Sequence, residues 1–123
     1  MVAYREPMEI LTFDELTNPN NNVEFEGADH GGAGVSFFVM NAERGRGPSL
    51  HTHDYHEVLI TLEGRATFHG PDGDIDIGPG HVTIVPPGEP HGFTSSGDVP
   101  LRQVNIHASP RLITQWLDDD AAG

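Results

Sequence analysis

Two histidines and a glutamate, all able to bind a metal, lie within seven residues of the sequence. His51 and His53 are separated by one residue, and Glu57 follows four positions after His53. Residues two apart on a strand point to the same face, so both imidazoles would project together, and Glu57 shares their parity. A carboxylate on an inward face is costly unless a cation or metal pairs with it. The group therefore indicates a site for a divalent transition metal, and the alternative is exposed loop histidines beside an ordinary surface glutamate.

Glycines flank this group at regular positions. Gly45 and Gly64 complete the pattern G-x5-H-x-H-x3-E-x6-G, and a second run from Gly80 to His91 has the pattern G-x5-P-x-G-x2-H. A stretch of 15 residues, 65–79, separates the two runs. The runs resemble the two motifs of the cupin superfamily. Over about residues 35–107 the sequence is similar to a small single-domain cupin.

The resemblance implies an all-β fold, the antiparallel double-stranded β-helix or jelly-roll barrel. It also implies that His51, His53 and Glu57 of the first motif and His91 of the second are metal ligands. The second motif often ends in Asn four residues after its His, where this chain has Ser95. Three imidazole nitrogens and one carboxylate oxygen suit Fe, Mn, Ni, Cu or Zn, and the sequence leaves the identity of this one divalent metal open.

Two residues beside the ligands are candidates for a catalytic acid or base. His56 has the opposite strand parity from Glu57, so it is either a surface residue or a group that acts on a ligand or substrate from nearby. Tyr55 is either a phenol donor at the site or part of the packing. The sequence leaves both alternatives open.

Three further residues are candidates for contacting a substrate. Phe38 and Met40 belong to an apolar run whose ordinary role is core packing, although part of such a face can line the mouth of a barrel. His107 has the same parity as Asn105 in the last expected strand, and both could contact a ligand if that face looks inward. Arg44 and Arg46, which flank Gly45 before the first ligand, could bind a substrate carboxylate or be solvated arginines.

The composition excludes several classes of chemistry. The 123 residues contain no Cys, which rules out thiol nucleophiles, disulfides and thiolate metal sites. All six basic residues are Arg, so Schiff-base chemistry on a lysine is excluded. The formal charge of −13 disfavours binding to nucleic acid. Without an N-terminal apolar leader or a stretch of about 18 apolar residues, we expect a cytoplasmic protein with no membrane contact.

Short apolar runs alternate with Gly- and Pro-rich turns, as all-β folds require. The expected strands are Val35–Met40, Val58–Leu62, Ala66–His69, Asp74–Ile77, Val82–Val85, Phe93–Ser95 and Leu101–His107, with Ile10–Phe13 and Val23–Glu26 as weaker candidates. Pro71-Asp72-Gly73 predicts a hairpin turn. A short C-terminal helix is expected from an N-cap at Ser109 and the apolar positions 112, 113, 116 and 117.

The chain is expected to form one domain. Residues 1–34 would supply N-terminal strands or an arm that contacts a second copy, residues 35–108 the barrel, and residues 109–123 the helix and an acidic tail. By resemblance to small cupins, a homodimer is expected.

Three functions fit these features. The leading hypothesis is a metal-dependent oxygenase acting on a small organic substrate. An isomerase or cyclase would use the same metal without O₂. A non-catalytic module that binds or senses a small molecule is the third hypothesis, because the fold hosts many unrelated functions.

Overall fold

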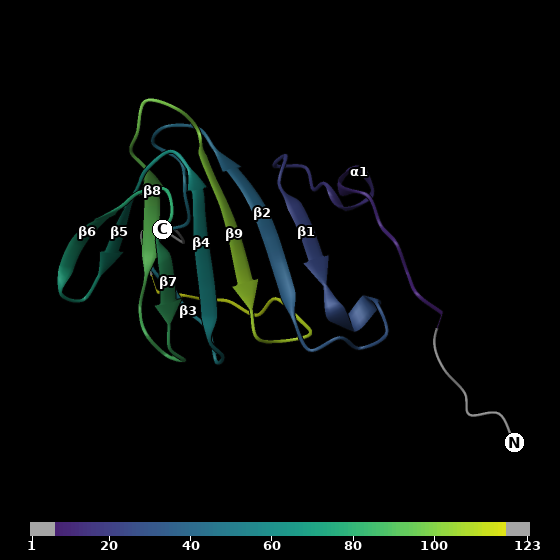
Figure 1. Ribbon diagram of the computed structural model, residues 1–123. Helices are drawn as coiled ribbons and strands as arrows, with labels where there is room; N and C mark the ends of the chain where they lie inside the picture. Colours follow the sequence, from purple (N-terminus) through teal and green to yellow (C-terminus); the bar gives the residue numbers. More distant parts are fainter. Residues whose placement is uncertain (1–6, 118–123) are drawn as a thin grey trace, which may run out of the picture.

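Residues 7–117 of the computed structural model form a barrel in which two antiparallel sheets face each other (Figure 1). The larger sheet has the strand order β1-β2-β9-β4-β7, the smaller has the order β6-β5-β8, and β10 pairs with β3. The elements are α1 (Phe13–Leu16), β1 (Val23–Glu26), the 3-10 turn η1 (Gly27–Asp29), β2 (Ser36–Ala42), β3 (His51–Thr52), β4 (Glu57–Glu63), β5 (Ala66–Gly70), β6 (Gly73–Ile77), β7 (Val82–Val85), β8 (Gly92–Ser95), β9 (Leu101–His107) and β10 (Gln115–Trp116). All these strand pairs are antiparallel, which confirms the expected double-stranded β-helix.

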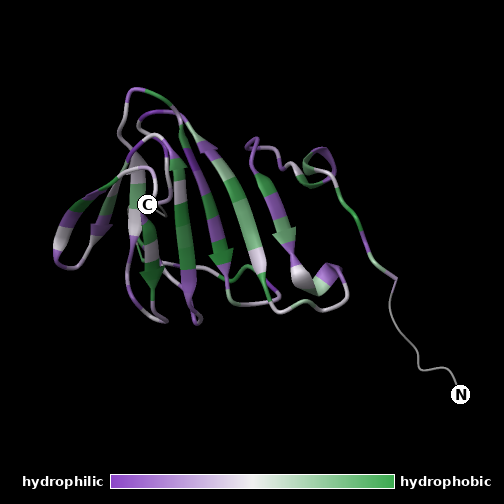
Figure 2. Cartoon of the chain, in the orientation of Figure 1, coloured by the Kyte–Doolittle hydropathy of each residue, from purple (hydrophilic) through white to green (hydrophobic). Residues whose placement is uncertain are grey.

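Strand β9 shows how the sequence fills the barrel. Every second residue of β9 is buried and the residues between them are half-buried, and hydrophilic and hydrophobic bands follow one another along the strand (Figure 2). Because successive side chains of a strand point to opposite faces, Leu101, Gln103, Asn105 and His107 all point inward. The inward row of β9 is therefore apolar at its start and polar at its end.

Neighbouring strands continue this gradient. At the start of β9, Leu101 pairs with Ala42 and belongs to the apolar core. At its end, His107 pairs with Ser36 on β2 and Glu57 on β4. The core is completed by Leu59, Ala66, Phe68, Val85 and Phe93. The barrel thus has an apolar half that stabilises the fold and a polar half that is available for chemistry.

Most strand predictions are confirmed, including Val23–Glu26 as β1 and the hairpin at Pro71-Asp72-Gly73, which joins β5 to β6. The strand predicted for Ile10–Phe13 is wrong. Thr12 instead accepts a hydrogen bond from the Glu15 amide at 3.3 Å and caps the short helix α1.

The predicted C-terminal helix is also wrong. Residues 115–116 form β10, which pairs with β3, and the Leu117 amide donates to the Leu50 carbonyl at 3.1 Å. The Ile113 carbonyl accepts a hydrogen bond from Nδ1 of His53 at 2.7 Å. These partners replace the hydrogen bonds of a helix, so tertiary contacts override the local helical pattern. The predicted acidic tail, residues 118–120, lies outside the described residues.

The glycine spacing of the two motifs has a backbone cause. Gly45, Gly64, Gly80 and Gly88 have φ values of 88°, 76°, 86° and 79°. Residues other than glycine rarely adopt this left-handed backbone conformation. The glycines therefore mark the turns that bring the strands carrying the candidate ligands together. The described residues contain no helix with the length and apolar character of a membrane span.

Gly47 offers a test of the tight packing beside β8. Its φ is 153°, and a Cβ there would overlap the Phe93 carbonyl oxygen. We expect Gly47→Ala to lower the free energy of unfolding by at least about 2 kcal/mol, from backbone strain and overlap. Gly34→Ala is the matched control, because nothing lies within 4 Å of its Cβ position, and it should change stability by less than about 1 kcal/mol. Urea unfolding measures both, and equal effects of the two substitutions would contradict this account.

Candidate metal centre

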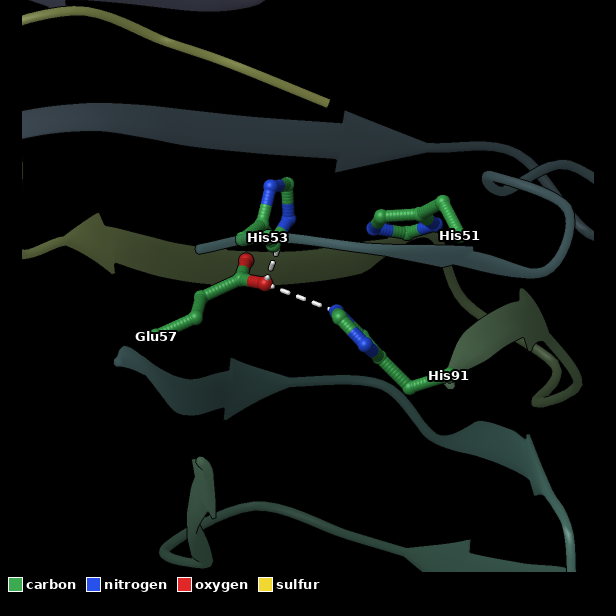
Figure 3. A group of neighbouring side chains, drawn as sticks. All are labelled: His51, His53, Glu57 and His91. Carbon is green, nitrogen blue, oxygen red and sulfur yellow. Dashed lines mark hydrogen bonds and ion pairs between the residues drawn. The ribbon is translucent and has the colours of Figure 1, made fainter. Parts of the chain in front are cut away.

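Four buried side chains converge inside the polar half of the barrel. His51, His53, Glu57 and His91 each offer one ligand atom, and these atoms all lie within 4.8 Å of one another. Figure 3 shows the three imidazoles and the carboxylate pointing toward a common centre. Each residue is at most 5% exposed. The structure therefore brings together the four residues that the motifs predicted, in a cluster that could hold a metal ion.

Backbone pairing aligns the two motifs. The His51 amide donates to the His91 carbonyl at 2.9 Å, and the His91 amide donates to the His51 carbonyl at 3.0 Å. The Gly88 amide donates to the His53 carbonyl at 2.8 Å. The turn after Pro86 thus lies against the first motif, and His91 sits directly opposite His51.

Glu57 reaches the centre of the cluster from a different strand than His51, whereas the sequence pattern suggested one continuous strand. β3 ends at Thr52, the chain bends at Asp54 and Tyr55, and Glu57 begins β4 in the larger sheet. The shared parity with His51 therefore gave the right position for the carboxylate, but the two residues are not on one continuous strand. The bend places the carboxylate opposite the imidazoles instead of beside them.

The three imidazoles of the cluster share one tautomer. Nδ1 of His51 lies 2.7 Å from the Ser49 carbonyl, Nδ1 of His53 2.7 Å from the Ile113 carbonyl, and Nδ1 of His91 2.9 Å from the Glu89 carbonyl. A carbonyl oxygen can only accept, so each Nδ1 carries the proton and donates it. In the neutral ring, each Nε2 is then left with a lone pair, which is the arrangement a metal-binding histidine needs.

The Glu57 carboxylate is surrounded by these nitrogens. Oε1 lies 2.8 Å from Nε2 of His91 and 3.2 Å from Nε2 of His53, and Oε2 lies 3.2 Å from Nε2 of His107. Burial alone would raise the pKa of Glu57, but its contacts with His107, His53 and His91 hold that pKa well below its usual range. The carboxylate is therefore ionised at neutral pH.

The histidine pKa values respond to the same surroundings. Burial lowers the pKa of His51 to about 4, and the neighbouring His91 and His53 add to this shift. Burial also opposes the charged form of His53, but the Glu57 carboxylate and the Ile113 carbonyl outweigh it and raise the pKa of His53. At neutral pH His51 is thus a neutral imidazole.

The cluster fits a divalent cation. Lone pairs of neutral Nε2 atoms that face a carboxylate repel it unless a proton or a metal ion lies between them. Nε2 of His53 is buried and lies 3.2 Å from Oε1 of Glu57, without the geometry of a hydrogen bond. A metal ion would satisfy both the carboxylate and the nitrogens, and with one carboxylate an M²⁺ site would keep a net charge of +1. The donor set of three nitrogens and one oxygen suits a transition metal.

A cavity of about 680 Å³ opens beside the cluster, a size ordinary for small-molecule sites. Its lining includes His51, His53 and Glu57. The rest of its wall includes four asparagines of one loop, several apolar and aromatic side chains, and a few polar ones: Asn18, Asn20, Asn21, Asn22, Phe38, Met40, Arg46, Phe93, Asn105, His107 and Trp116. The predicted substrate contacts Phe38, Met40 and His107 therefore all line the cavity.

The two candidates for acid–base catalysis lie elsewhere. The His56 side chain is exposed and does not line the cavity, because its parity in the chain points it outward. Tyr55 lies behind the cavity wall, where its hydroxyl is 2.8 Å from Nδ1 of His107. Tyr55 is thus linked to the site by its hydrogen bond with His107, and His56 lies at the surface.

Two parts of the cavity wall were missed from the sequence. The Trp116 ring lies 5.0 Å from the His51 ring, centre to centre, whereas the helical pattern around it predicted only a covering helix. The loop of residues 18–22 lines the cavity as well. The run of asparagines in this loop was the one signal available, since asparagine also suits turns.

Asn105 is a polar group that faces the cavity without a partner. Its side chain is 3% exposed, and within the described residues its Oδ1 has no hydrogen-bond partner. Its strand neighbours on either side are Phe38 and Leu59. An unpaired buried amide costs about 1–3 kcal/mol, so this position favours a partner that enters the cavity.

An antiparallel β-barrel with a buried group of three histidines and a glutamate beside a cavity defines a protein of the cupin type. The chain belongs to the family of AraC-like ligand-binding domains, whose model matches residues 35–122. No curated protein matches the chain in sequence.

Solved structures share this fold. An uncharacterised conserved protein with a double-stranded β-helix domain from Klebsiella pneumoniae is 22% identical with a TM-score of 0.71, over 91% of this chain and 99% of that one. The polyketide cyclase RemF from Streptomyces resistomycificus is 19% identical with a TM-score of 0.72, over 93% and 89%. A cupin 2 domain-containing protein from Halorhodospira halophila is 22% identical with a TM-score of 0.69, over 85% and 75%. At these identities the likeness concerns the fold.

Metal affinity should depend on pH in a defined direction. Because the pKa of His53 is raised above 6.5, a proton competes with the metal for this nitrogen around and below neutral pH. We expect Zn²⁺ affinity to fall as the pH is lowered from 7.5 to 5.5, and the loss from His53 alone to approach about tenfold per pH unit once the pH lies below the pKa of His53. His51, with its pKa of about 4, should not compete in this range. Competition titrations with a chromogenic chelator measure the affinity, and a constant value across the range would contradict the assignment.

Proposed function

We propose that this chain binds one divalent transition metal through His51, His53, Glu57 and His91, and that it acts as a metal-dependent oxygenase on a small organic molecule in the adjacent cavity. The observation that carries the metal site is the shared tautomer of the three imidazoles. Each Nδ1–H is donated to a backbone carbonyl, so each Nε2 can bind a metal next to an ionised carboxylate once it carries no proton.

The cavity supports a small organic ligand. When bound, the metal would polarise a coordinated oxygen of the substrate and, if it is redox-active, supply electron transfer to O₂. Phe38, Phe93 and Trp116 give the cavity an apolar surface on which a carbon skeleton can pack. Asn105 can donate and accept hydrogen bonds, so it suits a hydroxyl or carbonyl group of the ligand. Arg46 is available for a substrate carboxylate at the rim.

Two other functions remain in the proposal, each favoured by a particular observation. An isomerase or cyclase is favoured by the hydrogen-bonded contacts from Tyr55 through His107 to Glu57, because they place groups able to hold a proton beside the cluster. A non-catalytic module that binds a small molecule is favoured by membership of a ligand-binding family.

Substrate-dependent O₂ consumption tests the function. The protein is loaded with Fe²⁺ and mixed with a panel of enols, hydroxy-ketones and hydroxy-acids, which can offer two oxygen ligands to a metal. We expect O₂ uptake that needs both metal and substrate, and that falls at least about 100-fold in the His51→Ala/Glu57→Ala variant because the metal is lost. Asn105→Leu is the companion variant, since it should keep the metal and weaken substrate binding.

The other outcomes discriminate between the alternatives. Conversion of a substrate without O₂ by the Zn²⁺-loaded protein would replace the oxygenase by an isomerase or cyclase. Saturable binding without turnover under either condition would favour the binding module.

A homodimer and a cytoplasmic location complete the proposal. Met8 and Ile10, ahead of α1, are 87% and 83% exposed. An apolar segment of this kind suits contact with a second copy of the chain. Light scattering would measure the mass of the protein in solution and so distinguish a dimer from a monomer.

A further inference from the structure

Another histidine contacts Glu57, and it lies outside the group formed by His51, His53 and His91. His107 is 4% exposed, and its Nε2 lies 3.2 Å from Oε2 of Glu57. Among residues 7–117, however, no backbone carbonyl is hydrogen-bonded to its Nδ1. This nitrogen lies 2.8 Å from the hydroxyl of Tyr55. A hydroxyl can donate a proton as well as accept one, whereas a carbonyl can only accept. His107 is therefore free to adopt the tautomer that the other three histidines cannot.

The contacts of Tyr55 indicate which way its proton points. The Ile113 amide donates to the Tyr55 hydroxyl at 3.1 Å. The hydroxyl has one proton, which can go to Nδ1 of His107 at 2.8 Å or to the Ile113 carbonyl at 3.1 Å. That carbonyl already accepts the Nδ1–H of His53 at 2.7 Å. The shorter contact to an otherwise unused acceptor favours His107.

We propose that Tyr55 and His107 are positioning residues of the metal centre: Tyr55 donates to Nδ1 of His107, and His107 in turn donates its Nε2–H to Oε2 of Glu57. The hydrogen bonds then run in one direction, from the Ile113 amide through Tyr55 and His107 to the Glu57 carboxylate. Each donor and acceptor in this series of hydrogen bonds is used once. This inference rests on the proposed metal site and assigns different roles to the four histidines around Glu57.

The arrangement divides the two oxygens of Glu57. Oε2 is held by His107, while Oε1 faces His91 and His53. Glu57 then offers one oxygen to the metal, and His107 is excluded from the ligand set because its Nε2 carries a proton. The number of protein ligands is in this way fixed at four, although five candidate donor groups surround the centre.

The proton positions can be measured directly. Long-range ¹H–¹⁵N correlation spectra of ¹⁵N-histidine-labelled protein at pH 7.5 distinguish the two tautomers, first without metal and then with Zn²⁺. A spectrum of His107→Gln assigns the His107 signals. We expect His107 to carry its proton on Nε2 in both states, whereas His51, His53 and His91 carry it on Nδ1 and bind Zn²⁺ through Nε2. A proton on Nδ1 of His107, alone or with a second on Nε2, would overturn the proposal.

Substitutions give a second, independent readout. His107→Leu removes the donor to Oε2 and should lower Zn²⁺ affinity by about 10–100-fold. His107→Gln keeps an N–H at a similar reach and should retain affinity within about tenfold. Tyr55→Phe leaves His107 without a donor at Nδ1 and should also weaken Zn²⁺ binding. The unfolding midpoint of each metal-free variant separates this effect from a loss of fold, and equal Zn²⁺ affinities for the Leu and Gln variants would contradict the proposal.

Different results would exclude the metal site and the positioning role of His107. If the wild-type protein binds no Zn²⁺, the proposed metal site is wrong, and the spectra of the metal-free protein still decide whether Tyr55 donates to His107. If Zn²⁺ binds and the Nε2 of His107 is among its ligands, the metal site stands and the positioning role is wrong.

Discussion

The structure depends on one electrostatic constraint, which is the burial of the Glu57 carboxylate. At 3% exposure, an ionised carboxylate needs compensation from the protein or from a bound cation. Four imidazoles surround it, and three of them give their Nδ1 protons to backbone carbonyls at positions 49, 89 and 113. Those three rings, when neutral, turn lone pairs toward the carboxylate. A metal ion at the centre would satisfy both kinds of group, which is the physical basis for proposing a metal site here.

The barrel supplies the rigidity that such a cluster requires. The inward face of β9 is apolar at Leu101 and polar at His107, so one half of the barrel packs as a core while the other half holds the site. The C-terminal segment closes the arrangement from outside. The Ile113 carbonyl orients His53, and Trp116 packs beside His51. Side chains on strands are held more firmly than side chains on loops, which favours a fixed metal geometry.

The sequence was sufficient for the fold and for the four residues that converge, because motif spacing and glycine positions reflect the backbone turns directly. Gly45, Gly64, Gly80 and Gly88 all have positive φ, so their spacing marks where the strands turn. The role of residues 113–117 could not be predicted, because their local pattern favours a helix, whereas residues 115–116 form a strand that pairs with β3. The contact of Tyr55 with His107 joins residues 52 positions apart. Neither local propensity nor parity reports such a pairing.

The metal content of the tag-free protein tests the central claim most directly. Elemental mass spectrometry of the wild-type protein, beside the His51→Ala/Glu57→Ala variant, counts the metal ions bound per chain. The account predicts about one equivalent of a divalent transition metal in the wild type and none in the variant, because two of the four ligands are missing there. Absence of metal from the wild type, even after reconstitution with Fe²⁺, Mn²⁺, Ni²⁺, Cu²⁺ and Zn²⁺ in turn, would contradict it.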